Sequence, residues 1–184
     1  AAVADELSRR GLKVHAIARR EDRLAQQTGC VIHSLDIRDT KALAALLGSL
    51  EVDVLVNNAG VAIGGPINLI DTDVFRQQFE VNFFGLIEVT KSFLSMLGAV
   101  KNSNQQGKII NIGSLTTSTT LNQVSVYTAT KGAVGQLTKA QALELGQYNI
   151  QANAICPGFV VTPLTEKIWS DSTMRNWGEG NIPL

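Results

Sequence analysis

Apolar runs rich in valine and isoleucine alternate along the chain with segments of helical periodicity. The runs predict β-strands at residues 13–18, 30–35, 52–57, 108–112 and 150–155. The segments around them predict helices at residues 1–10, 21–27, 39–50, 71–98 and 125–147. Strands that alternate with helices are typical of parallel sheets, because each helix returns the chain to the start of the next strand. The pattern therefore predicts an α/β fold with a doubly wound parallel sheet.

Three of these segments carry more apolar residues than a half-exposed element needs. The runs at 52–57 and 108–112 are almost continuously apolar, which predicts strands buried on both faces of the sheet. The helix at 71–98 has apolar residues on more than one side, so we expect it to cover the sheet and a second surface as well. That second surface is either another helix of the same chain or a second subunit.

Composition and charge exclude several classes of protein. The 184 residues are 45% hydrophobic and 17% charged, which predicts one soluble domain over residues 1–184. Sixteen lysines and arginines balance sixteen aspartates and glutamates, so we expect no nucleic-acid partner, which would need a basic excess. Every apolar run is far shorter than the roughly 20 residues of a membrane helix, so we expect no membrane segment. Only two cysteines are present, and we expect a cytoplasmic location.

Tyr127 and Lys131 stand four residues apart near the start of a predicted helix, so their side chains share one face. An ammonium close to a phenol favours the phenolate and lowers the pKa of the tyrosine from ~10 towards neutrality. A tyrosine tuned in this way can act as a general acid or base. Taken alone, such a pair is more often ordinary helix surface, and its context decides between the two interpretations.

Small or polar residues follow three consecutive predicted strands and supply that context. The sequence NNAG ends the third strand, Ser114 follows the fourth, and Pro157 and Gly158 follow the fifth. In open α/β sheets, ligands bind in the crevice outside the carboxyl ends of the strands. The sequence therefore predicts a ligand site at this edge of the sheet, and no metal site.

Motifs along nearly the whole chain identify a family. They are NNAG at 57–60, Asn82 within VNFFG, Ser114 within NIGS, YTATK at 127–131 and NAICPGFVVT at 153–162, with Ser114 thirteen positions before Tyr127. In order and spacing, this set resembles the short-chain dehydrogenase/reductase family. The resemblance implies a Rossmann-type sheet and an NAD(P)-dependent oxidoreductase that interconverts a secondary alcohol and a ketone by hydride transfer. Its partner would be a small-molecule carbonyl or alcohol substrate.

The resemblance also implies roles for individual residues. Tyr127 would be the general acid or base, Lys131 would lower its pKa and hold the cofactor ribose, and Ser114 would polarise the substrate oxygen. Asn82 would anchor a water molecule that links Lys131 to solvent. The remaining cofactor contacts would be Asn58, Ala59 and Gly60 on the adenosine side, Asp36 at the adenine, and Pro157, Gly158 and Thr162 beside the nicotinamide.

The end of the first predicted strand bears on the choice of cofactor. An acidic residue there would bind the 2′-hydroxyl of NAD and repel a 2′-phosphate. This chain instead has Ala18 followed by Arg19 and Arg20, and a guanidinium accepts a phosphate. The sequence therefore favours NADP(H) over NAD(H), with Arg19 as the contact. The alternative is a pair of solvated charges ahead of a helix.

Two departures from the family pattern concern the ends of the chain. The first strand and the glycine-rich TGxxxGxG turn are absent, and residue 184 falls before the family's last helix and strand. We therefore expect a fragment, with a sheet incomplete at both ends, that neither folds stably nor binds cofactor alone. The function above belongs to the full-length parent. The alternative is a truncated or non-catalytic nucleotide-binding protein of the same fold.

Substrate and assembly are left partly open by the sequence. Residues 164–184 mix tryptophan, lysine and glutamate, which fits a sugar acid or polyol, a β-ketoacyl group or a larger apolar carbonyl compound. Trp169, Met174 and Trp177 could form a lid over the substrate or pack on the C-terminal part. The apolar stripes on the helices at 71–98 and 125–147 predict a homodimer or homotetramer.

Overall fold

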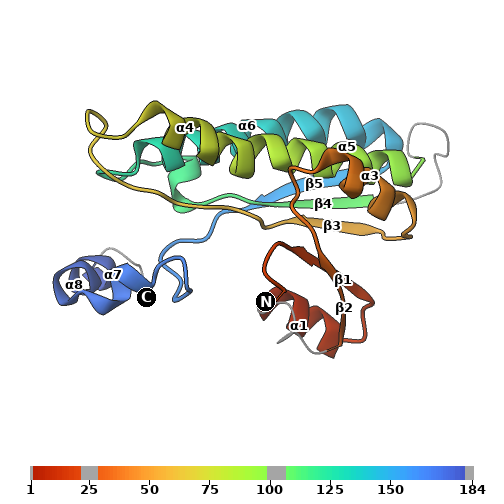
Figure 1. The fold of residues 1–184 in the computed structure, drawn as a ribbon, viewed down its shortest axis with the longest axis horizontal. Coiled ribbons are helices and arrows are strands. Elements are labelled where there is room, and N and C mark those ends of the chain that lie inside the picture. The colour runs from red at the N-terminus through yellow and green to blue at the C-terminus, as the bar shows by residue number, and fades with distance from the viewer. Residues whose placement is uncertain (1, 22–28, 99–106, 181–184) are drawn as a thin grey trace.

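The computed structural model describes residues 2–21, 29–98 and 107–180, and its ribbon is drawn in Figure 1. The strands are β1 (Val14–Ala18), β2 (Cys30–Ser34), β3 (Val54–Asn57), β4 (Gly107–Ile112) and β5 (Ile150–Ile155). The helices are α1 (Ala2–Arg9), α3 (Thr40–Gly48), α4 (Thr72–Phe79), α5 (Gly85–Met96), α6 (Ser125–Leu145), α7 (Glu166–Ser170) and α8 (Ser172–Gly180). The predicted strands all form, with ends within about two residues of those expected. The helix predicted at 21–27 lies, apart from Glu21, outside the described residues.

Two helices begin where the sequence predicts because an aspartate caps each of them. The Asp39 carboxylate accepts a hydrogen bond from the Ala42 amide at 3.0 Å ahead of α3, and Asp71 accepts one from the Asp73 amide at 2.8 Å ahead of α4. An N-cap side chain of this kind satisfies an amide that the helix itself leaves unpaired.

The helix predicted at 71–98 is not regular throughout. A π-helical turn, η1 (Glu80–Phe84), separates α4 from α5 and contains Asn82. Such turns insert an extra residue into a helix and often lie at functional sites. Short 3₁₀ turns, η2 (Leu115–Thr117) and η3 (Gly146–Tyr148), precede and follow α6.

The strands pair in parallel, as predicted, but in two sheets. β1 pairs with β2, and β3, β4 and β5 form a three-stranded sheet with β4 in the centre. Within the described residues, β1 and β3 therefore each keep one edge without a paired strand. The fold has the expected α/β architecture. The expected single sheet is divided in two, because β1 and β3 do not pair.

Within the described residues, helices cover one face of the three-stranded sheet. Figure 1 shows α3, α4, α5 and α6 together on one side of β3, β4 and β5. Burial accordingly alternates along β4, where Gly107 and Ile109 are buried and Lys108 is exposed. Val54 and Ile155 are 46% and 53% exposed. The prediction that β3 and β4 are buried on both faces is therefore wrong for this chain, because its described helices cover a single face.

Two apolar clusters hold the layers together. Phe93 and Leu97 from α5 and its end pack on Ile109, Ile150 and Ala152 of β4 and β5. Leu43 and Leu47 of α3 pack with Val89 of α5, and Ile17 and Leu35 from the β1–β2 region join them. Each fully buried side chain of this size contributes about 1.5–3 kcal/mol to folding. The second cluster therefore links the two-stranded sheet to the helical layer.

A polar network lies between the sheet and the helices. Asn57 and Asn111 are register partners on β3 and β4, and Asn57 Nδ2 donates to Asn111 Oδ1 at 2.9 Å. Asn111 Nδ2 donates in turn to Thr138 Oγ1 at 2.9 Å and to Gln141 Oε1 at 2.8 Å, both on α6. Asn57 also donates to Thr90 of α5 at 3.1 Å. All five side chains are buried, so the network fixes how α5 and α6 sit on the strands.

We predict that Asn111→Leu in the full-length protein lowers the free energy of unfolding by about 3 kcal/mol, because it leaves buried partners unpaired. Urea unfolding measures this change. Gln136→Leu is the matched control, since Gln136 is exposed on α6, the helix to which Asn111 bonds. A loss for Asn111→Leu no larger than that of the control would contradict the role of the network.

Candidate active site

The carboxyl ends of β3, β4 and β5 bring together most of the side chains that the sequence singled out. Residues 58–60 follow β3, Ser114 follows β4, and Pro157 follows β5. Tyr127 and Lys131 enter from the first turns of α6. The parallel sheet therefore gathers segments up to about a hundred residues apart at one edge, as predicted.

Ser114 is held rigidly at the end of β4. It is the N-cap of η2, where its Oγ accepts hydrogen bonds from the Thr116 amide at 3.2 Å and the Thr116 hydroxyl at 3.1 Å. The Ser114 amide donates to Thr117 Oγ1 at 3.0 Å, which completes a capping box. The next amide, of Leu115, donates to the Pro157 carbonyl at 2.8 Å and ties this turn to the end of β5.

Tyr127 lies half-buried in α6, and the Ser114 side chain is close enough to influence its pKa. Burial raises the pKa of Tyr127 above its usual value, and hydrogen bonding with the Ser114 side chain is the smaller, opposing influence. The expectation that Lys131 lowers the pKa of Tyr127 is not met in this structure. The phenol is therefore held in its protonated form at neutral pH.

Lys131 lies one turn further along α6 and is only 5% exposed. Its Nζ donates to the Ile112 carbonyl at 2.6 Å and lies 5.8 Å from the centre of the Tyr127 ring. Burial lowers the pKa of Lys131 to about 8, since desolvation penalises the ammonium. The amine thus lies over the face of the ring and loses its charge as the pH rises through about 8.

Asn82 supports the loop after β3. Its Oδ1 accepts from the Val61 amide at 2.8 Å, and its Nδ2 donates to the Val61 carbonyl at 2.9 Å and to Thr130 Oγ1 at 3.0 Å. Both N–H groups of the amide are therefore used within the protein. The water-anchoring role implied for Asn82 stays a prediction.

Charged residues gather at the ends of β1 and β2. Arg38 donates to both carboxylate oxygens of Asp36, with Nη2 at 2.6 Å from Oδ2, and Arg19 Nη1 lies 3.9 Å from the same oxygen. The hydrogen bonds from Arg38 lower the pKa of Asp36 to about 2. The sequence predicted Arg19 and Asp36 here but missed Arg38. The sequence signal for Arg38 was its place two residues after Asp36. Arg38 comes near Arg19 only in the folded chain.

The residues after β5 are arranged less tightly. Pro157 contacts the Ser114 turn through its carbonyl, whereas Thr162 lies in an exposed turn in which its amide donates to Thr165 Oγ1 at 3.0 Å. α7 and α8 pack on one another and lie apart from α3–α6 in Figure 1. Met174 is 48% exposed. This arrangement favours neither interpretation of Trp169 and Met174, and the side chain of Trp177 lies outside the described residues.

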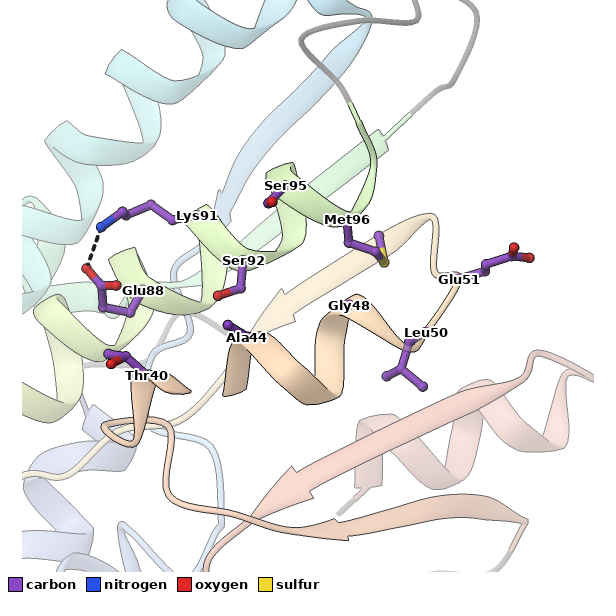
Figure 2. A pocket seen from close by; sticks show the side chains of 10 residues that line it. All are labelled: Thr40, Ala44, Gly48, Leu50, Glu51, Glu88, Lys91, Ser92, Ser95 and Met96. Atoms are coloured by element: carbon purple, nitrogen blue, oxygen red, sulfur yellow. Dashed lines mark hydrogen bonds and ion pairs between the residues drawn. The ribbon is translucent and has the colours of Figure 1, made fainter. Parts of the chain in front are cut away.

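A groove of about 580 Å³ opens elsewhere, between α3 and α5. Figure 2 shows Thr40, Ala44 and Gly48 on α3 facing Ser92 and Ser95 on α5, with the Glu88–Lys91 ion pair at one end. None of the predicted site residues lines it. This groove is therefore separate from the site at the strand ends.

Other candidate features add no second chemical centre. In residues 2–21, 29–98 and 107–180, no group of three or more metal-ligating side chains comes together. His15 and His33, on β1 and β2, stack and share a 2.9 Å hydrogen bond between His15 Nδ1 and His33 Nε2. No helix among the described residues has the length and apolar character that crossing a membrane requires.

Comparisons with known proteins agree with this geometry. The profile of the short chain dehydrogenase family matches residues 1–173. The L-xylulose reductase of Homo sapiens is 37% identical over 151 residues, which cover 82% of this chain and 61% of that enzyme's length.

Solved structures share the fold as well. A variant of actinorhodin polyketide ketoreductase, solved with NADPH, has a TM-score of 0.84 and 31% identity, covering 91% of this chain and 69% of that one. Gluconate 5-dehydrogenase from Burkholderia cenocepacia, solved with NADP and tartrate, has a TM-score of 0.84 and 26% identity, covering 95% and 72%. With its Ser114, Tyr127 and Lys131 gathered at the strand ends, the chain belongs to the short-chain dehydrogenase/reductase family.

Proposed function

We propose that the full-length protein is an NAD(P)-dependent oxidoreductase that interconverts a secondary alcohol and a ketone, with Tyr127 as the general acid or base. The observation that carries the proposal is the gathering of Ser114, Tyr127 and Lys131 at the strand ends, with the buried amine of Lys131 5.8 Å from the centre of the Tyr127 ring. The substrate would be a small molecule. The names of the relatives, a sugar reductase, a gluconate dehydrogenase and a polyketide ketoreductase, support that class without selecting one compound.

The residues at the strand ends fit a nicotinamide dinucleotide. Lys131 has three N–H groups, of which one donates to Ile112, so donors are left for the ribose hydroxyls. Gly60 has no side chain, and a Cβ there would lie 3.7 Å from Lys131 Nζ, so the loop backbone runs close to the amine. The cofactor, when bound, supplies or accepts the hydride. Asn58, Ala59, Pro157, Gly158 and Thr162 are proposed as further contacts.

The proton chemistry follows from this chain's own side chains. In the reducing direction, the Ser114 and Tyr127 hydroxyls would both donate hydrogen bonds to the ketone oxygen. Tyr127, kept protonated by its burial, would give its proton to that oxygen as the carbon receives the hydride. The resulting phenolate would be stabilised by the ammonium of Lys131. Oxidation of the alcohol reverses these steps.

Arg19 and Arg38 support NADP(H) as the cofactor. Both guanidiniums are more than one-third exposed and lie around one carboxylate, Asp36, so the cluster has an excess positive charge facing solvent. A 2′-phosphate would be bound by such a pair. The Asp36 carboxylate is bound by Arg38. Asp36 would therefore contribute to adenine binding by holding these two guanidiniums in position.

A homodimer or homotetramer stays a prediction. Phe84, at the end of η1, and Leu143, near the end of α6, are 48% and 84% exposed, which supports an interface over these helices. The cytoplasmic location also stays a prediction.

We predict that Tyr127→Phe lowers kcat on the order of 10²-fold or more, because the general acid is lost. The dissociation constant for NADPH, measured by fluorescence titration, should stay within about twofold, since the phenol oxygen is a small part of the binding surface. Tyr148→Phe is the matched control, because Tyr148 packs on the apolar cluster under α5. Turnover by Tyr127→Phe close to that of the control would exclude this mechanism.

The pH dependence follows from Lys131. Its pKa is lowered to about 8, so the stabilising ammonium is present below pH 8 and is lost as the pH rises through that value. We predict that kcat/KM for ketone reduction falls above about pH 8. The charge of an arginine does not titrate in this range, so an active Lys131→Arg variant should not show this fall in kcat/KM. A wild-type profile that is flat from about pH 6 to 10 would contradict this assignment.

Arg19→Asp should weaken NADPH binding about tenfold or more and change NADH binding by less than about threefold, because it replaces an attraction for the 2′-phosphate by a repulsion. Calorimetry with both cofactors measures the difference. Arg20→Asp is the control, since it makes the same charge change at the next, exposed residue. Equal responses of both cofactors to Arg19→Asp would mean that Arg19 does not contact the phosphate.

A further inference from the structure

Two side-chain amides hold the backbone of the loop after β3 at alternate residues. At Ile63, the amide donates to Gln78 Oε1 at 3.1 Å, and Gln78 Nε2 donates to the carbonyl at 3.1 Å. At Val61, Asn82 makes the same pair of bonds, at 2.8 and 2.9 Å. We call Gln78 and Asn82 the amide clamp.

The spacing of the clamp explains how it works. Gln78 and Asn82 are four residues apart, about 6 Å along a helix, and therefore lie on the same side of it. Val61 and Ile63 are two residues apart, about 6.6 Å along an extended chain. Each amide offers one donor and one acceptor to one residue, as a neighbouring β-strand would. The helical segment α4–η1 thus bonds the loop backbone in the way that a neighbouring strand would.

The clamp is buried, and most of its hydrogen bonds hold the loop. Gln78 and Asn82 are 0% and 1% exposed. A buried amide costs free energy unless its polar atoms are paired, so these side chains would be unfavourable there without the loop. Asn82 also donates to Thr130 of α6, which joins the clamp to the helix that carries Tyr127 and Lys131.

Both ends of the clamped segment reach the candidate active site. Before it, Gly60 lies so that a Cβ would be 3.4 Å from Asn82 Oδ1 and 3.7 Å from Lys131 Nζ. After it, the Gly65 amide donates to the Gln123 carbonyl at 2.7 Å, just ahead of α6. A Cβ at Gly64 would lie 2.8 Å from the same carbonyl oxygen, so the loop has little room to shift towards α6.

We propose that Gln78 is a positioning residue for the nicotinamide cofactor, which acts by holding the loop at 61–63 so that residues 58–60 stay beside Lys131. The inference rests on the proposed function, because it assigns the loop a cofactor to contact. Gln78 is remote from the proton transfer itself: within the described residues its side chain bonds to Ile63, and no hydrogen bond joins it to Ser114, Tyr127 or Lys131. Its loss should therefore affect cofactor binding and leave the chemical step largely unchanged.

The first test compares Gln78→Leu with Gln77→Leu in the full-length protein. Gln77 is exposed on the same helix, so its variant makes the same chemical change outside the clamp. We expect Gln78→Leu to raise the dissociation constant for NADP⁺ about tenfold, measured by calorimetry, with kcat at saturating cofactor within about threefold of wild type. Hydrogen exchange at the Ile63 amide should be faster in Gln78→Leu alone.

The second test uses Gln78→Glu, which also decides the matter if Gln78→Leu does not fold. A protonated carboxyl offers one donor and one acceptor, as the amide does, whereas a carboxylate has no donor for the Ile63 carbonyl. The ratio of the variant's NADP⁺ dissociation constant to that of wild type should therefore be near one at low pH and should grow as the pH rises. A ratio that stays the same at every pH would contradict the role of the paired donor and acceptor.

The outcomes separate the two proposals. Wild-type protein that binds neither NADP⁺ nor NAD⁺ would refute the proposed function, and the role of Gln78 with it. Wild-type protein that binds cofactor, with equal affinities for Gln78→Leu and Gln77→Leu or a pH-independent ratio for Gln78→Glu, would refute the positioning role alone. Weaker binding together with a pH-dependent ratio would support it.

Discussion

Pairing of buried amide side chains is the constraint on which the rest of the structure depends. Asn57 and Asn111 bond across β3 and β4 and reach Thr138 of α6, so the strands and the helix share one polar interior. Gln78 and Asn82 meet the same requirement by bonding the loop after β3. Because each of these groups is costly to bury unpaired, only one placement of helix, loop and strand satisfies them together.

That placement sets the chemistry at the strand ends. With α6 fixed on β4, Lys131 donates to the Ile112 carbonyl and Tyr127 lies near the Ser114 side chain. Burial then moves the two pKa values in opposite directions, up for the phenol and down for the amine, since the neutral form of each is favoured. The result is a protonated tyrosine beside a lysine that can change its charge near neutral pH, an arrangement suited to passing a proton.

The described helices cover the strands unevenly. α3, α4, α5 and α6 cover one face of the three-stranded sheet and α3 reaches the β1–β2 region through the cluster at Leu43 and Leu47. The opposite face keeps apolar side chains such as Val54 and Ile155 partly exposed. The polar contacts of the site lie on the covered side and at the strand ends, so the arrangement of Ser114, Tyr127 and Lys131 forms despite the divided sheet.

The sequence by itself determined the elements and most of the candidate catalytic side chains, because both are local. Hydrophobic periodicity placed the five strands and the helices α1, α3 and α6 within a few residues, and the Tyr127–Lys131 spacing and Ser114 belong to short motifs. Only the tertiary structure decided the π-helical turn at Asn82, the clamp by Gln78, the pairing of Arg38 with Asp36 and the raised pKa of Tyr127. Hydrogen-bond partners come from segments that are distant in the chain, and burial depends on which segments cover a residue. No local sequence pattern encodes either.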